Sequence, residues 1–456
     1  SNYRLSFTDN ALQISARPLT VSFAPQSKIY DGNTSAPFIG FVIGNLANQE
    51  TVGLVGTGSY DHRIVGTAQA ISYTRLTPVG GSGKASNYSI ATTATGSGTI
   101  TQLGSVNWLS NVSTGDWANA SNWAGGALPD GSNVANVTLP AGVSVSFSGT
   151  TAATTLTSLS GSGATLALQG GSLTTGNATL GSYNQSGGSF DAAGNMNIET
   201  NFIRSGGSFG VHGLLTINQS SGDLKLNTNS ALILGQIRVQ SGNLQIDNSG
   251  SVTSSNTAEV SASGNIEIIA HSPITVGAGG ITAGNGITLN ATTASADSTI
   301  TTEGKLTGGS GLVSLTAYQS ITQNANITGA NIELTSQHGN ITMASSALST
   351  VPTGGNIRLL ASLGDILTSA SNFAGAIPQI RDRRFSEASD ASVSTTLASV
   401  TSTIANLSDD SAAVGPVVEA PVLVATGPSA LAQLDSNRTT GGETGTFGAS
   451  DTTTTS

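Results

Sequence analysis

The chain has 456 residues, of which 9% are charged and 5% aromatic, and glycine alone occupies 58 positions. The absence of cysteine excludes a disulfide scaffold, a thiolate metal site and a thiol nucleophile. Abundant Gly, Ser, Thr, Asn and Val favour short strands and tight turns over helices. The net charge of −10 offers no basic face for nucleic acid, and no apolar run approaches the roughly 20 residues that span a bilayer.

A repeated Asn-Tyr motif organises the amino-terminal part. Asn2-Tyr3 and Asn87-Tyr88 lie 85 residues apart, and each is followed by strand-like alternation. Residues 1–16 are therefore expected to be the last strands of a truncated repeat, and 17–102 a complete copy. A repeat of this length has the size of a small β-sandwich.

The complete copy carries a recognisable signature. Lys28-Ile29-Tyr30-Asp31-Gly32 follows Arg17-Pro18-Leu19, and together they resemble the YDG/MBG-type Ig-like repeats of very large bacterial surface exoproteins. This resemblance implies an Ig-like sandwich. The residues themselves predict a turn at Tyr30–Gly32, because Asp caps turns and Gly accepts positive φ. We prefer the turn to any binding role for these residues.

Residues 103–134 hold all three tryptophans, Trp108, Trp117 and Trp123. One interpretation is a platform on which sugars stack. The other, which we favour, is a cap or junction whose large rings cover the open end of the following domain.

Residues 135–380 are quasi-periodic. Five copies of an aliphatic–polar–aliphatic motif begin at Ile266, Ile287, Val313, Ile332 and Ile357, at steps of 21, 26, 19 and 25 residues. Because side chains alternate along a strand, the aliphatic residues are expected to face a core while Glu267, Thr288, Ser314, Glu333 and Arg358 face outward. Further strands are expected at Ile274, Ile300, Ile321, Ile341 and Ile366, and at Ile281, Leu306 and Ile327. Two or three short strands per repeat of about 20 residues predict roughly 12 turns of a parallel β-helix.

Asparagines precede several of these strands. Asn265, Asn331, Asn340 and Asn356 are expected to form ladders in which one turn bonds to the next. The whole pattern resembles filamentous haemagglutinin-like exoproteins of two-partner secretion systems. That resemblance implies an outer-membrane secretion partner and a location outside a Gram-negative cell or on its surface. Relatives anchored through a cysteine pair differ from this chain, which has none.

Residues 381–456 are expected to be an acidic low-complexity tail. Ile380–Phe385 is a short basic stretch that either ends the stack or is a solvated turn. Val393, Leu397, Val400, Ile404 and Leu407 follow a helical seam that would dock or self-associate, although the Ser and Thr between them oppose a helix. The predicted fold is thus all-β: a small Ig-like sandwich, a right-handed parallel β-helix and a low-complexity tail.

The sequence offers no catalytic, cofactor-binding or metal-binding residues. Carboxylates in the repeats fall on different turns, and His62, His212, His271 and His338 are isolated in sequence. Tyr183, Phe202 and Tyr318 are the few candidates for sugar stacking, whereas Phe190 and Phe209 are expected in the core.

We therefore expect the carboxy-terminal part of a large secreted adhesin, a rigid non-catalytic rod. Its partners would be a host surface, a glycan or biofilm matrix, with self-association possible. The alternatives are a passive subunit of an extracellular filament or sheath, and a β-helical polysaccharide-degrading enzyme.

Overall fold

A computed structural model describes residues 15–149 and 153–382. These residues are nearly all β, and their only helices are short 3₁₀ segments: η1 (Ala85–Asn87), η2 (Ala120–Asn122), η3 (Ala124–Gly126) and η4 (Ala370–Asn372). The chain divides into two compact units. Of the described residues, the first contains 15–109, 117–138 and 154–156, and the second contains 110–116, 139–149, 153 and 157–382. The truncated repeat expected at 1–16 and the tail expected at 381–456 lie almost wholly outside the described residues.

The amino-terminal β domain is built on one mixed sheet. Its strand order is β3-β9-β7-β6-β4, with β3 parallel to β9 and the other pairs antiparallel. Tyr73 of the central strand stacks on Phe23 of a separate antiparallel pair at 3.5 Å between ring centroids, which packs the two layers together. The strands are β1 (Arg17–Pro18), β2 (Thr20–Phe23), β3 (Gln26–Ile29), β4 (Ser35–Ala36), β5 (Phe41–Gly44), β6 (Gly53–Tyr60), β7 (Gly66–Val79), β8 (Tyr88–Ser89) and β9 (Thr93–Thr101).

The segment expected to form a junction contributes strands to two parallel pairs. In the first unit, β10 (Leu103–Asn107) pairs with β12 (Val134–Thr138). In the second unit, β11 (Thr114–Asp116) pairs in parallel with β13 (Ser144–Phe147). Strands from between and around the tryptophans therefore take part in parallel pairing.

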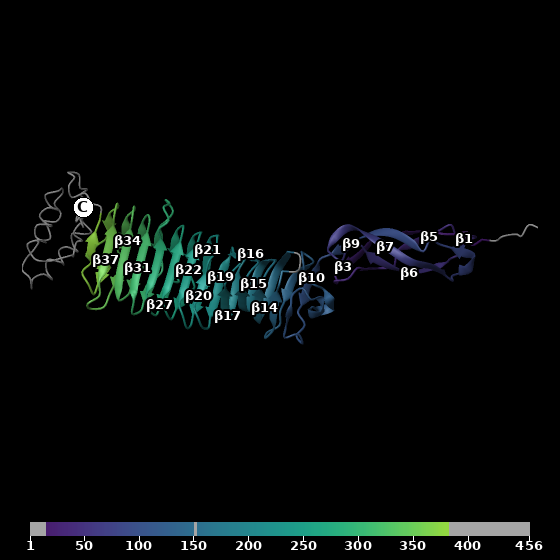
Figure 1. Ribbon diagram of the computed structural model, residues 1–456. Coiled ribbons are helices and arrows are strands. Elements are labelled where there is room, and N and C mark those ends of the chain that lie inside the picture. Colours follow the sequence, from purple (N-terminus) through teal and green to yellow (C-terminus); the bar gives the residue numbers. More distant parts are fainter. Residues whose placement is uncertain (1–14, 150–152, 383–456) are drawn as a thin grey trace, which may run out of the picture. The chain divides into compact units, whose positions relative to one another are not determined.

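The second unit is a parallel β-solenoid. Over the described part of the chain the solenoid has about 12 turns. Strands from successive turns lie side by side in Figure 1. The earlier turns use β14 (Thr154–Leu168), β15 (Ser172–Gln185), β16 (Ser189–Ala192), β17 (Met196–Arg204), β18 (Ser208–Val211), β19 (Leu214–Gln219) and β21 (Leu232–Val239).

One column of strands forms an eight-stranded parallel sheet. It consists of β20 (Leu224–Leu226), β22 (Leu244–Asn248), β25 (Ile266–Ala270), β28 (Ile287–Ala291), β31 (Leu312–Ala317), β34 (Asn331–Ser336), β37 (Ile357–Ala361) and β40 (Gln379–Arg381). A second column holds β23 (Val252–Ser254), β26 (Ile274–Val276), β29 (Ile300–Thr302), β32 (Ile321–Gln323), β35 (Ile341–Met343) and β38 (Ile366–Leu367). A third holds β24 (Val260–Ala262), β27 (Ile281–Ala283), β30 (Leu306–Gly308), β33 (Ile327–Thr328), β36 (Ser349–Thr350) and β39 (Phe373–Ala374).

The predicted register is confirmed. Ile266 pairs with Ile287, and the column continues through Val313 and Ile332 to Ile357, with every side chain at most 1% exposed. The second and third columns follow the predicted isoleucines and leucine in the same way. Each turn thus buries its aliphatic side chains against those of its neighbours. This burial stabilises the fold by about 1.5–3 kcal/mol per side chain.

An aromatic cluster fills the solenoid core at β15–β18. Phe190 and Phe209 are buried as predicted, with ring centroids 5.7 Å apart. Tyr183 and Phe202 are buried with them, so the expectation that these two are available for sugar stacking is wrong. Tyr183 faces inward because the strand register shifts between Leu180 and Ser182. The shift exchanges the inward-facing and outward-facing positions beyond it.

We predict that Tyr183→Phe leaves stability unchanged or raises it by up to about 1 kcal/mol. Among the described residues the buried Tyr183 hydroxyl has no hydrogen-bond partner, and burial raises its pKa. Removing an unsatisfied hydroxyl costs no internal hydrogen bond and relieves a desolvation penalty. Chemical denaturation of both proteins measures the difference; a loss of more than 1 kcal/mol would show that the hydroxyl is bonded.

Candidate functional site

The outer face of the eight-stranded sheet carries one polar column. Gln245, Glu267, Thr288, Ser314, Glu333 and Arg358 occupy equivalent outward positions on successive turns. Glu267 and Glu333 are separated by two intervening strands, as expected. The column therefore presents isolated hydrogen-bonding groups rather than a pair of facing carboxylates.

A ladder of asparagines runs beside this column. The Asn243 Oδ1 atom accepts the backbone N–H of Asn265 at 2.8 Å, and Asn265 Oδ1 accepts that of Gly286 at 3.0 Å. Asn331 Oδ1 accepts from Asn356 in the same way at 3.0 Å. The predicted ladder is confirmed as side chain to backbone, whereas Asn340 precedes β35 and belongs to a different column, bonding to Asp365.

An aspartate stands at one end of the ladder. Asp223 Oδ1 accepts both the backbone N–H of Asn243, at 2.9 Å, and its side-chain amide, at 3.0 Å. These two hydrogen bonds hold the pKa of the Asp223 carboxyl below its ordinary value. The Asp223 carboxylate therefore accepts the same kind of backbone hydrogen bond as the asparagine amides of the ladder.

The ladder is interrupted at two turns. Gly286 and Leu312 occupy the position that asparagine holds in the flanking turns. A Cβ atom on Gly286 would lie 2.7 Å from the Leu312 carbonyl oxygen, so the close approach of the two turns excludes a side chain there. Leu312 instead directs an apolar side chain outward and is 39% exposed.

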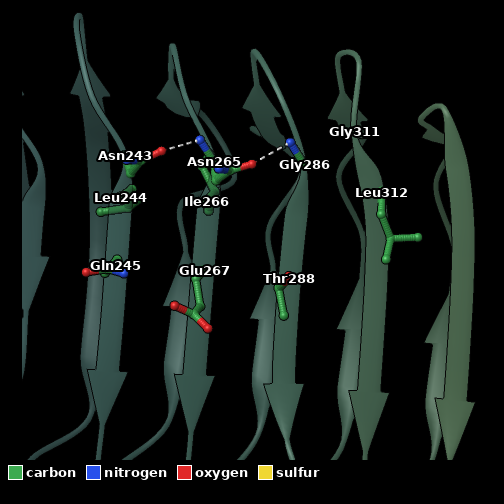
Figure 2. Close-up of a pocket in the computed structure, with 10 residues that line it drawn as sticks. All are labelled: Asn243, Leu244, Gln245, Asn265, Ile266, Glu267, Gly286, Thr288, Gly311 and Leu312. Carbon is green, nitrogen blue, oxygen red and sulfur yellow. Dashed lines mark hydrogen bonds between the residues drawn. The ribbon is translucent and has the colours of Figure 1, made fainter.

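A shallow hollow of about 350 Å³ lies at this interruption (Figure 2). Gln245, Glu267 and Thr288 line it with an amide, a carboxylate and a hydroxyl, and Leu312 supplies an apolar wall. Such a surface can bond hydroxyl groups while packing against C–H groups. No sequence reasoning singled it out, although Gly286 and Leu312 depart visibly from the asparagines of the other copies.

A second hollow of about 400 Å³ lies over the aromatic cluster. His212 Nε2 lies 3.0 Å from Asp191 Oδ1 on its rim. The neighbouring Arg204 guanidinium is already bound to Gln185 Oε1 at 2.9 Å and to the Gly207 carbonyl at 2.9 Å, and it covers the Phe209 ring. Its donors therefore face the protein, which leaves this hollow with less to offer a ligand than the first.

The histidines isolated in sequence have neighbours in space. His62 and His271 lie 3.7 and 3.8 Å from Asp61 and Asp247, and the ring of exposed His338 lies 4.1 Å from that of Tyr318. Tyr318, the third candidate for sugar stacking, is thus half-buried against a histidine. In residues 15–149 and 153–382 no three His, Asp or Glu side chains form a group suited to a metal ion.

The three tryptophans form a closed cluster. Each is 1% exposed; the Trp123 ring meets Trp108 and Trp117 edge to face at 5.0 and 4.8 Å. Trp117 Nε1 donates to the Pro129 carbonyl at 2.8 Å, and Trp123 Nε1 to that of Trp117 at 2.7 Å. Rings buried in this way support the structural interpretation and leave no open face for a sugar.

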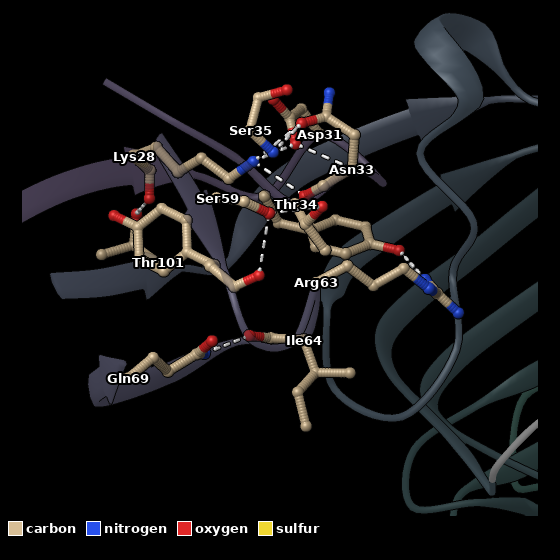
Figure 3. A network of polar contacts seen from close by, with 12 residues as sticks. Lys28, Asp31, Asn33, Thr34, Ser35, Ser59, Arg63, Ile64, Gln69 and Thr101 are labelled. Atoms are coloured by element: carbon tan, nitrogen blue, oxygen red, sulfur yellow. Dashed lines mark hydrogen bonds and ion pairs between the residues drawn. The ribbon is translucent and has the colours of Figure 1, made fainter. Parts of the chain in front are cut away.

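The turn predicted at the Tyr-Asp-Gly signature is present, and polar contacts hold it (Figure 3). Lys28 Nζ donates to Asp31 Oδ1 at 2.7 Å and to the Asn33 carbonyl at 2.8 Å, and Asp31 Oδ1 also accepts the Asn33 backbone N–H. Gly32 has a φ of +79°. Asp31 and Gly32 thus serve the turn as their residue types predict.

The fold defines a β-solenoid protein with an amino-terminal β domain. The YDG domain family matches residues 15–95, which fall within that β domain. No curated protein and no solved structure is significantly similar to the chain. Over the described ranges, no helix is both long and apolar enough to cross a membrane.

Proposed function

We propose that the chain is part of a large secreted bacterial surface adhesin, in which the solenoid is a stiff, non-catalytic rod that presents a contact surface. The observation that supports this most is the unbroken stack of paired aliphatic side chains, because such a column resists bending and gives an outer face of constant geometry. A YDG domain in the same chain supports a structural, adhesin-like role.

The resemblance to filamentous haemagglutinin-like proteins extends the proposal. Export would use an outer-membrane partner of a two-partner secretion system, and the protein would act at the surface of a Gram-negative cell. Self-association into a filament or sheath stays an alternative. The ligand we favour is a hydroxyl-rich glycan of a host surface or biofilm matrix, held at the hollow beside Leu312.

A glycan array probed with the full chain tests this proposal. Leu312→Asn places a ladder residue at the interruption and removes the apolar wall, so we expect it to keep the fold and lose binding. Glu333→Gln alters the same outward column outside the hollow and should bind as the wild type does. Absence of binding to any glycan, or release of new reducing ends from a bound polysaccharide, would contradict a non-catalytic glycan adhesin.

A further inference from the structure

The tyrosine of the signature makes a polar contact outside its own repeat. Tyr30 follows β3 and is 1% exposed. Its hydroxyl donates to the Leu128 carbonyl at 2.8 Å and accepts from Arg63 Nη1 at 2.5 Å. The carbonyl belongs to the tryptophan segment, residues 103–134, of which 103–109 and 117–134 lie in the same compact unit as Tyr30. A turn alone would not require this contact.

Arg63 adds a salt bridge to Asp130 of the tryptophan segment. It lies between β6 and β7, and its guanidinium engages Asp130 with both terminal nitrogens, Nη1 to Oδ1 at 3.2 Å and Nη2 to Oδ2. The Asp130 side chain is 10% exposed. Asn133 completes the network, donating to Asp130 Oδ1 at 2.6 Å and accepting the Val65 backbone N–H at 2.8 Å. Bidentate pairing of this kind fixes orientation as well as distance.

The glycine of the signature meets the same segment. A Cβ atom on Gly32 would lie 2.2 Å from the Gly126 carbonyl oxygen. Glycine is favoured here for two reasons. The positive φ of the turn disfavours other residues, and the close approach of the Gly126 backbone leaves no room for a side chain. Two of the three signature residues therefore serve contact with the tryptophan segment.

We propose that the Tyr-Asp-Gly loop together with Arg63 is a docking surface for the segment that follows a YDG repeat. The partner it fits presents a backbone carbonyl to the tyrosine, a carboxylate to the arginine and a side-chain-free backbone to the glycine. In this chain Leu128, Asp130 and Gly126 supply those groups. This role is independent of adhesion, because it uses no residue of the solenoid surface.

Tryptophan fluorescence of the full chain during thermal unfolding tests the proposal. Trp108, Trp117 and Trp123 are the chain's only tryptophans, so the signal follows the docked segment and not the repeat. Arg63→Ala leaves a nearly buried carboxylate unpaired, and we expect it to lower the fluorescence midpoint by about 5 °C or more. Lys84→Ala removes an equal charge from an exposed site of the same repeat and should shift it by less than about 1 °C.

A double-mutant cycle separates docking from general destabilisation. The shift of the Arg63→Ala, Asp130→Ala double variant should fall well short of the sum of the single shifts, because both remove one interaction. Additive shifts, or a fluorescence midpoint unchanged by Arg63→Ala, would overturn the proposal. If Arg63→Ala does not fold, Tyr30→Phe decides: it keeps the ring, removes one hydroxyl, and should lower the same midpoint by a smaller amount.

The docked segment should also lose stability at high pH. Burial, and then the Asp130 carboxylate, raise the pKa of Tyr30 to about 12. The unfolded chain releases this proton near pH 10, so the stabilisation is complete below pH 10 and disappears as the pH rises towards 12. We expect the fluorescence midpoint to fall more steeply over this range in the wild type than in Tyr30→Phe. Equal slopes would show that Tyr30 does not contribute.

Discussion

Ile332→Asp should unfold the solenoid, with a loss of at least about 4 kcal/mol. Ile332 is fully buried and pairs with Val313 on one side and Ile357 on the other. A carboxylate at this point would lie between two aliphatic layers with no cation beside it. Because each turn contacts only its neighbours, disruption of one turn separates the stack into two shorter pieces. Thermal unfolding followed by far-ultraviolet circular dichroism measures the effect.

The adjacent residue provides the control. Glu333 follows Ile332 on β34 and faces outward between Ser314 and Arg358. Glu333→Gln keeps the side-chain shape and should change stability by no more than about 0.5 kcal/mol. Equal melting of the two variants would mean that the inward and outward positions are assigned wrongly.

Trp123→Ala should destabilise the tryptophan segment by about 3–5 kcal/mol. The ring contacts the other two tryptophans, and its Nε1 atom donates to a buried carbonyl. Truncation removes all three contacts and leaves a cavity. Fluorescence of Trp108 and Trp117 during denaturation reports the change.

Tyr318→Ala is a useful comparison because its ring is half-buried and rests on the exposed His338. We expect a loss of less than about 1 kcal/mol from that variant. If Trp123→Ala were equally mild, the tryptophans would be surface rings, and a sugar platform would become the better interpretation.

The solenoid could be predicted from sequence because its signal is local and repeated. Alternation around Ile266 fixes which side chains face inward, and recurrence at Ile287 and Val313 implies the stack. The asparagine ladder follows from the same recurrence.

Other features depend on contacts that no local signal encodes. Arg63 and Asp130 are 67 residues apart, and nothing in their surroundings marks either as a partner. The inward turn of Tyr183 depends on an irregularity in β15 that simple alternation does not foresee. The hollow beside Leu312 arises where the repeat departs from its own pattern, and such departures are where functional positions are expected.

Double electron–electron resonance, which measures the distance between two spin labels, tests the stacked register most directly. The chain has no cysteine, so Glu267→Cys and Arg358→Cys introduce the only labelling sites. Both positions face outward, four strand spacings apart along one sheet. At about 4.8 Å per strand, their backbones should lie about 19 Å apart, with a narrow distribution broadened only by the labels. A broad distribution, or a distance beyond about 40 Å, would contradict the stack.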